Sequence, residues 1–497
     1  MPLVLLLLAI EVSYVFIITA GTFTTWSTWN TNYDLIGAGF RSGHLYIPVP
    51  PPPELLARPN PFDWSNSNLW FLDASLYKGH YYLYWAPLPA LLLLAVKTAL
   101  RIKDVVGDQY VVFASYTLIL LGGALVIARM TRRLFPQVPA GMTLAATAAL
   151  AFTTPTTFML ATPGIYQAAI AATQAFLLLG LVFGFDAVWA ASEGPPARWR
   201  LLAAGSCWAA AIACRVSAVL PASVFVLLTA FFSSNFPAST PRRQPWRRAA
   251  VSACWLGAPV ALTLAALALY NKVRFDSWTE VGVKYQLNVF PFVTSRAYLP
   301  LNIFSYLFRP VGTSCRFPFL SALYDIGERG FLHGTVFPPG YSTHEPQAGL
   351  FVTSPWTWLV LVALFFAGRG CVRWWRSPER AIPLDRRRRT EIWCVASFAA
   401  LTLLMPVVFL SAFSTTMRYL GDFSTGAALL AVWGGWSLLG AVQGRWSRWA
   451  VLALLVGLAA ATVLIGLLLG VEGYDGMFKG HNHELYESLR RRLSFCR

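Results

Sequence analysis

The stretch "TNYDLIGAGFRSGHLYI" (31–47) places one acid, Asp34, soon after the first apolar run of the chain. A carboxylate at a membrane mouth can serve as a general base, because partial burial raises the pKa of an acid toward neutral pH. Asp34 also begins a short amphipathic segment, and an aspartate at a helix start commonly caps it. Catalysis and capping are compatible, and the spacing leaves both open.

Five basic side chains are candidates for binding a phosphate group at the membrane surface. Arginine suits this role because its planar fork pairs with two oxygens at once. The candidates are Lys78 and His80 in an aromatic segment (70–94), Arg215 between two apolar runs, Arg274 just after another, and Arg418 in a turn.

Some of these groups have a purely structural alternative in the membrane itself. The tyrosines and tryptophans around Lys78 and His80 are typical of an interfacial aromatic belt. Arg215 lies in or near an apolar region, so it is either functional or extends its long side chain to the surface. Tyr166 lies near the start of another apolar run, so we expect it at the same outer level of the membrane as Arg215. Its expected role is in acceptor binding or in loop structure.

Two further pairs could form ordinary helical salt bridges. Arg418 and Asp422 are four residues apart in "TMRYLGDFSTG", and Glu280 and Lys284 are four apart in "YNKVRFDSWTEVGVKYQL". Opposite charges at that spacing face each other on a helix. We expect Glu280, Tyr285 and Asp422 to contribute to acceptor binding or to loop structure.

A membrane bundle must position these groups. Hydrophobic residues make up 56% of the 497 residues and charged residues 12%, with a mean hydropathy of +0.54. A soluble domain carries about twice that charged fraction. The apolar runs are continuous rather than alternating, which excludes a β-barrel. The net charge of +17 does not indicate nucleic acid, because much of the arginine lies in clusters between apolar runs. We predict an all-α polytopic membrane protein.

Arginine placement predicts the topology. If every apolar run crossed, with the N-terminus inside, the basic clusters would fall outside, against the positive-inside rule. Segment 86–100 is short, begins with two prolines and contains Lys97. If it is re-entrant or interfacial, all the clusters become cytoplasmic. The eleven remaining runs are then spans, with the N-terminus inside and the C-terminus outside. The runs lie near 3–21, 109–128, 141–160, 166–190, 201–214, 217–233, 249–270, 351–368, 391–413, 423–442 and 449–471; the clusters lie at 128–133, 197–200, 241–248, 369–380, 385–389 and 444–448.

This topology divides the chain into a transmembrane domain (1–471) and an extracytoplasmic tail (472–497). The domain carries two long outer loops, 22–108 and 271–350. Both are too long and too aromatic to be plain connectors. Loops held on a rigid scaffold are where function usually lies.

Motifs for nucleotide, zinc or serine-hydrolase chemistry are absent: the chain has no Walker A, GxSxG, HExxH or GxGxxG pattern. The seven cysteines show no CxxC spacing. We therefore predict no metal and no cofactor. Cys315 and Cys496 could both face outside, where a bond between them is an open alternative.

The early acid in "NYDLIGAGFRSGHLY", followed by an aromatic segment that runs into the proline-led "YWAPLPALLLL", resembles the pattern of GT-C membrane glycosyltransferases. That class includes protein O-mannosyltransferases and the aminoarabinose transferase of lipid A. "YNKVRFDSWTEVGVKYQL" and "RYLGDFSTG" are similar to a less characterised bacterial subgroup of this architecture. The similarity covers most of the chain in order and topology.

The resemblance implies transfer of a sugar from a polyprenyl-phosphate donor to an extracytoplasmic acceptor that it does not identify. Asp34 matches the position of the general base, and Asp73 is a second candidate acid. The family commonly has an Asp-Glu pair where this chain has "DL", so no metal-binding dyad is implied. The expected partners are membrane lipid and the lipid-linked donor, at the outer face of the bacterial cytoplasmic (inner) membrane. The cationic candidates for the departing phosphate are Lys78, His80, Arg215, Arg274 and Arg418.

Other functions remain open at this point. A lipid or solute transporter would share the bundle and the intramembrane arginine, but transporters typically show inverted repeats and broken helices in corresponding halves. The sequence shows no such symmetry. A polysaccharide polymerase or ligase is closer in chemistry, and a non-catalytic protein of envelope assembly is a third alternative.

Overall fold

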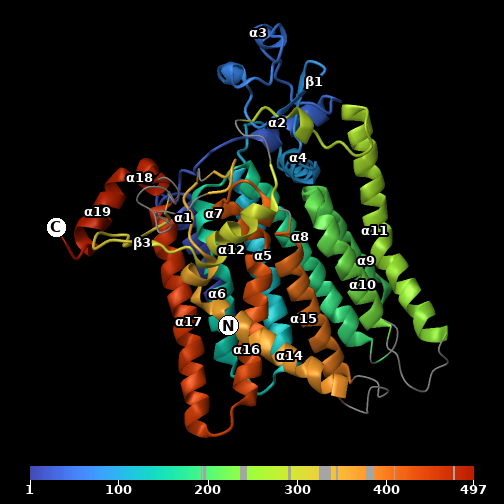
Figure 1. Cartoon of the computed structure of the whole chain (residues 1–497), viewed down its shortest axis with the longest axis vertical. Coiled ribbons are helices and arrows are strands. Elements are labelled where there is room, and N and C mark those ends of the chain that lie inside the picture. Colours follow the sequence, from blue (N-terminus) through green and yellow to red (C-terminus); the bar gives the residue numbers. More distant parts are fainter. Residues whose placement is uncertain are drawn as a thin grey trace.

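Helices dominate the structure and run mostly along its long axis, as the computed structural model shows (Figure 1). The described residues are 1–191, 193, 197–234, 243–288, 293–323, 337–342, 345–376, 385–407, 409–473 and 476–496. The helices are α1 Pro2–Ile18, α2 Asn32–Arg41, α3 Pro53–Leu56, α4 Leu88–Leu100, α5 Gln109–Leu134, α6 Ala140–Phe152, α7 Thr156–Ala161, α8 Ile165–Ala190, α9 Arg198–Cys214, α10 Val219–Ser233, α11 Arg243–Phe275, α12 Leu299–Phe308, α13 Leu350–Thr353, α14 Leu359–Arg376, α15 Arg386–Leu404, α16 Ser424–Ala441, α17 Arg445–Glu472, α18 Met477–His481 and α19 His483–Leu493. The strands are β1 Ser75–Tyr77, β2 His80–Tyr82, β3 Gly312–Thr313 and β4 Leu320–Ser321, in two antiparallel hairpins.

Seven helical stretches in the described residues are long and apolar enough to cross a membrane. This confirms the predicted all-α polytopic class. The count of eleven spans is not established, because α1, α6, α9 and α16, which cover the other four predicted runs, fall outside that set. The seven are Gln109–Leu134, Ile165–Ala190, Val216–Ser233, Trp246–Phe275, Pro355–Arg373, Arg386–Ser411 and Arg445–Glu472.

The core of the bundle is α8, which is rich in alanine and glycine and is buried along most of its length. A helix that is apolar all round belongs inside a bundle. Small residues let its neighbours approach closely. On α9, the indole of Trp208 fits against Gly180 and donates a hydrogen bond to the carbonyl of Leu177 (3.3 Å).

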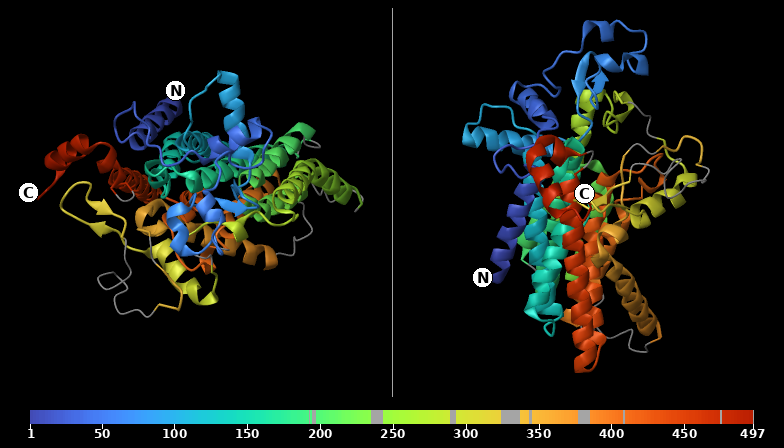
Figure 2. Two further views of the ribbon diagram at one scale, coloured as in Figure 1. Left: turned by 90° about the horizontal axis from the view of Figure 1, so that it is seen from above. Right: turned by 90° about the vertical axis from the view of Figure 1, so that its left-hand side faces the viewer.

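Segment 86–100 does not cross the bundle. It forms α4, which lies across one end, close to α2 and the β1–β2 hairpin (Figures 1 and 2). Pro87 and Pro89 flank its first residue, where a proline costs no hydrogen bond. We call this end of the molecule, which carries residues 22–108, the loop end.

The helix ends that carry basic clusters gather at the opposite end, which we call the basic end (residues 135–139, 191, 193, 197 and 442–444). Its turns are joined by contacts from arginine. Arg386 pairs with Glu193 (2.7 Å), and Arg448 donates to the carbonyl of Gln137 (2.6 Å). Figure 1 shows the α16–α17 turn at this end. The clusters at 241–248 and 369–380 lie partly outside the described residues.

The two long loops meet at the loop end. Backbone hydrogen bonds run from Asp73 N to Leu287 O (3.0 Å) and from Leu287 N to Ala74 O (2.8 Å). Ser75 also bridges to Gln286. Segments more than 200 residues apart therefore form one small layer, which we call the loop cap (residues 42–87 and 276–288).

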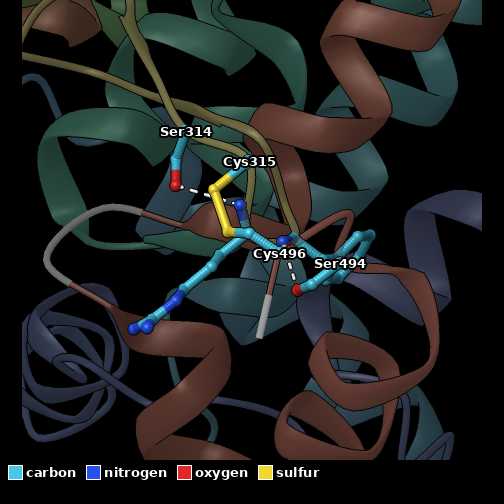
Figure 3. Close-up of a disulfide and its surroundings, with 6 residues drawn as sticks. Ser314, Cys315, Ser494 and Cys496 are labelled. Carbon is cyan, nitrogen blue, oxygen red and sulfur yellow. Dashed lines mark hydrogen bonds between the residues drawn. A yellow bond between two sulfur atoms is a disulfide. The ribbon is translucent and has the colours of Figure 1, made fainter.

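The C-terminal tail is tied to the second loop. Cys315 and Cys496 form a disulfide with a Cα–Cα distance of 5.6 Å (Figure 3). Beside it, Phe495 N donates to Cys315 O (2.9 Å) and Phe317 N donates to the hydroxyl of Ser494 (3.0 Å). The bond that the sequence left open is thus present.

Candidate active site

An apolar groove of about 480 Å³ lies between α2, α4, α9 and α11, near the loop end. Leu91 on α4 is 45% exposed although it lines the groove. The groove therefore opens to the outside of the bundle along α4. The lining residues are Phe40, Gly43, His44, Leu45, Pro87, Leu88, Leu91, Ala213, Thr263, Ala266, Leu267 and Tyr270.

The groove exists because α2 packs directly on α4. A Cβ built on Gly37 would lie 3.6 Å from the carbonyl oxygen of Ala90 and 3.7 Å from the Cβ of Leu94, so an alanine would already fill the space between the two helices. A larger side chain on α2 would push the two helices apart. The small residue therefore holds one wall of the groove, and Phe40 one turn later forms part of its lining.

Asp34 lies on the first turn of α2, at the loop end. Its carboxylate pairs with Lys97 of α4 (2.5 Å) and accepts a hydrogen bond from Val106 N (3.3 Å). The side chain is 11% exposed. The predicted acid thus lies beside Lys97, which the sequence analysis considered only in assigning the topology of segment 86–100.

Asp34 does not cap its own helix, so that alternative was wrong. Thr31 at the N-cap position makes no side-chain bond either. The cap comes from Asp108, whose carboxylate accepts from Tyr33 N (3.2 Å). Burial raises the pKa of Asp108 to about 7, against the opposing effect of its backbone hydrogen bonds. Sequence analysis missed this residue because it precedes α5 and lies far from α2 in the chain.

Asp73 lies where the loop cap meets the bundle. Its carboxylate accepts from the hydroxyl of Tyr166 (2.7 Å) and from the amide of Gln286 (3.2 Å). Burial raises the pKa of Asp73, while these hydrogen bonds and the nearby Arg418 oppose the shift. Its backbone φ is +65°, a strained value for a residue with a side chain, and such strain clusters at functional sites.

Arg418 completes this group, because its guanidinium lies 4.2 Å from the centre of the Tyr166 ring. We call Asp73, Tyr166 and Arg418 the Asp73 cluster. The ring of Trp85 contacts Tyr166 edge-on (4.8 Å). Pro87, two residues after Trp85, lines the groove, so a short segment connects the cluster to the groove.

The predicted Arg418–Asp422 pair was wrong. Arg418 pairs with Glu345 (2.9 Å) and Asp422 pairs with Arg215 (2.5 Å). The reason is local geometry: Met417–Asp422 forms a 3₁₀ helix, in which residues three apart rather than four share a face. The guanidinium groups of Arg215 and Arg418 both lie near the ring of Tyr419, at 6.0 and 5.7 Å from its centre.

The predicted Glu280–Lys284 pair is also absent from the described structure. The segment is a loop with a short 3₁₀ turn, and the carboxylate of Glu280 accepts from Gly282 N (2.7 Å) instead. The ring of Tyr285 lies tilted against that of Tyr77 of β1, with 4.6 Å between the ring centres. Glu280 and Tyr285 therefore stabilise the loop cap, which is one of the two roles expected for them.

Lys78 and His80 project from the loop cap. Lys78 pairs with Asp276 (2.6 Å), and their side chains are 67% and 57% exposed. His80 stacks on Tyr46 (4.1 Å), which stacks on His44 (4.7 Å), and His44 lines the groove. Sequence analysis missed His44, although it lies in the same opening stretch as Asp34.

Arg274 lies behind the groove wall rather than in it. The side chain is buried and donates to Leu83 O (2.6 Å) and to the amide oxygen of Asn271 (2.9 Å). Its guanidinium lies 3.7 Å from the ring centre of Tyr270, which lines the groove. In this arrangement Arg274 fixes the loop cap to α11.

No group of three or more His, Cys, Asp or Glu side chains that could hold a metal ion occurs in the described ranges of the chain. The prediction of no metal remains a prediction.

No family model and no curated protein sequence matches the chain. Among solved structures, it is similar to the Archaeoglobus fulgidus oligosaccharyltransferase in the apo form, with a TM-score of 0.44 and 11% identity over 93% of this chain and 55% of that one. The chain therefore spans little more than half of that protein. It is also similar to ArnT from Cupriavidus metallidurans bound to undecaprenyl phosphate, with a TM-score of 0.39 and 12% identity over 98% of this chain and 77% of that one. Both are GT-C glycosyltransferases, the class that the sequence resembles, and at these TM-scores no residue's role is transferred from them.

Proposed function

We propose that the protein is a membrane glycosyltransferase that moves a sugar from a polyprenyl-phosphate donor to an acceptor at the loop end. The observation that carries this proposal is the apolar groove beside α4, which lies at the same end of the molecule as Asp34 and the Asp73 cluster. An apolar cleft with few, convergent polar groups is the usual form of a ligand site.

The groove suits the prenyl chain of the donor. Its walls are almost entirely apolar, and α4 offers a lipid-facing side through which a long isoprenoid can enter. Because the isoprenoid would enter from lipid, its binding would depend on van der Waals packing against the groove walls rather than on removal from water. The phosphate would then lie at the groove mouth, beside His44.

Cationic and aromatic groups at this mouth support binding of the phosphate. His44 and His80 flank Tyr46 in one stack, and Lys78 lies on the adjoining hairpin. An exposed ion pair such as Lys78–Asp276 contributes little to stability, so Lys78 can leave Asp276 for a phosphate at little cost. Fixed donors aimed at the departing phosphate stabilise the charge that develops there.

Asp34 is the proposed general base. It lies six residues before Phe40 on α2, a rise of about 9 Å along a helix, so one rigid element joins the base to the groove. Its carboxylate takes the proton of the acceptor hydroxyl or amine while the acceptor atom bonds to the anomeric carbon. The bond from that carbon to the phosphate oxygen breaks, and polyprenyl phosphate leaves. Asp73 is the second candidate for the base.

The placement of charge supports an orientation. The described basic clusters lie at the basic end, and the positive-inside rule assigns that end to the cytoplasm. The site would therefore face outside, at the cytoplasmic membrane of a bacterium.

Donor turnover by the purified chain in lipid nanodiscs tests the proposal. Radiolabelled polyprenyl-phosphate sugars should be consumed by the wild type and by Asp104→Asn, a matched exposed control in the same loop, but not by Asp34→Asn. The Asp73→Asn variant, assayed alongside, assigns the base if Asp34→Asn is active. Full turnover in both Asp34→Asn and Asp73→Asn would refute acid–base transfer at this site, and movement of intact donor across the bilayer would identify a carrier instead.

A further inference from the structure

The C-terminal tail leaves the bundle sideways. After α17 the chain turns at the loop end, and α18 and α19 extend away from the other helices (Figures 1 and 2). One face of α19 packs against the rest of the protein. Leu485 and Leu489 pack against a small core that includes Phe317 and Phe478.

The end of α19 presents a different surface, which we call the tail patch (Arg491, Arg492, Leu493 and Phe495). Phe495 is 87% exposed and Leu493 is 46% exposed. Among the described residues neither Arg491 nor Arg492 forms a salt bridge, whereas Arg490 pairs with Glu487 (3.4 Å). Two large apolar side chains beside two free cations are the composition of an interfacial segment.

The tail patch is held in place rather than frayed. The Cys315–Cys496 disulfide closes directly after it (Figure 3). The ring of Phe495 stacks on Phe319 at 5.0 Å, and its backbone N–H is bonded to Cys315 O. A fixed patch binds without the entropy cost of ordering a loose terminus.

We propose that the tail patch docks on the surface of the membrane beside the bundle, with Arg491 and Arg492 on anionic phospholipid headgroups and Phe495 and Leu493 in the acyl boundary. The charges favour this occupant, since arginine pairs well with phosphate and a lipid surface is the one partner always present at the flank of a membrane-spanning bundle. Aromatic and long cationic side chains are the groups that membranes collect at this level. The proposal does not depend on the transferase function.

Hydrogen exchange of the full-length protein in nanodiscs tests the docking. Peptides that cover residues 483–495 should exchange more slowly in discs that contain phosphatidylglycerol than in discs of phosphatidylcholine alone. Each arginine near an anionic surface contributes roughly a fivefold factor, the equivalent of about 1 kcal/mol, so Arg491→Gln/Arg492→Gln should remove up to roughly 25-fold of protection. High salt should remove the same arginine-dependent share of the protection from exchange.

A matched variant controls for loss of charge. Arg247→Gln/Arg445→Gln removes two exposed arginines outside the tail and should leave exchange at 483–495 unchanged. Phe495→Ser should weaken protection in both lipids, because it removes an apolar contact rather than a charge. Equal exchange in the two lipids, or protection that survives loss of both tail arginines, would overturn the proposal. Protection that appears only in native membranes and not in purified discs would assign the tail patch to a protein partner instead.

Discussion

Replacing Arg215 with methionine would leave the carboxylate of Asp422 without its partner inside the bundle. The Asp422 side chain is 0% exposed, and its second oxygen already lacks a partner among the described residues. An uncompensated buried charge of this kind costs about 3–5 kcal/mol. The reverse change, Asp422→Asn, leaves a guanidinium that is 15% exposed and lies over the ring of Phe409 (4.8 Å). Water and the ring can stabilise it, so we expect a cost of about 1–3 kcal/mol.

This difference in stability between Arg215→Met and Asp422→Asn can be measured by unfolding the purified variants in mixed micelles with increasing concentrations of a denaturing detergent. The double variant Arg215→Met/Asp422→Asn should be more stable than the sum of the single changes, by about 0.5–3 kcal/mol, because the two groups are in direct contact. Arg445→Met, at the basic end, is the control and should change stability by no more than about 0.5 kcal/mol. Additive single effects, or a larger loss for Asp422→Asn than for Arg215→Met, would refute this account of the pair.

Three further outcomes follow from other parts of the molecule. Gly205→Ala should cost about 1–3 kcal/mol in the same unfolding assay, because its Cβ would meet a backbone carbonyl of α11, whereas Gly257→Ala meets nothing and should be neutral or stabilising by about 0.5–1 kcal/mol. Burial raises the pKa of Asp108 from 3.8 to about 7, so the folded state binds more protons than the unfolded state between those values. Stability should therefore fall as pH rises from about 4 to about 7, and Asp108→Asn should flatten a pH series of unfolding midpoints. Cys496→Ser should lower stability by about 2–4 kcal/mol, and a reducing agent should lower the unfolding midpoint of the wild type but not of this variant.

The fold class and the flat α4 could be predicted from the sequence because both depend on local rules. The length of an apolar run and the count of nearby arginines are read directly along the chain, and they predicted that 86–100 is re-entrant or interfacial rather than a span. The same rules could not count the spans, since α1, α6, α9 and α16 are helices that length and apolarity alone do not mark as crossing.

The site was harder to predict because its contacts are long-range. Asp34 pairs with Lys97, which is 63 residues away in the sequence, and Asp422 pairs with Arg215, which is 207 residues away. Salt bridges predicted from α-helical spacing were wrong where the backbone is not α-helical, as at Met417–Asp422. Which acid meets which cation is set by how the helices pack, and that packing has no signature in a single sequence.

The junction between Asp73 and Gln286 also has a consequence for biosynthesis. These two residues are 213 positions apart, so the ribosome needs about 10 to 40 s to make the second after the first. During that interval the aromatic first loop lacks residues 286 and 287, to which its backbone later bonds. Slower insertion of α11 would lengthen this interval even in a chain whose first loop is unaltered. Variants that delay α11 should therefore engage chaperones more than the wild type does, although their folded structure is normal.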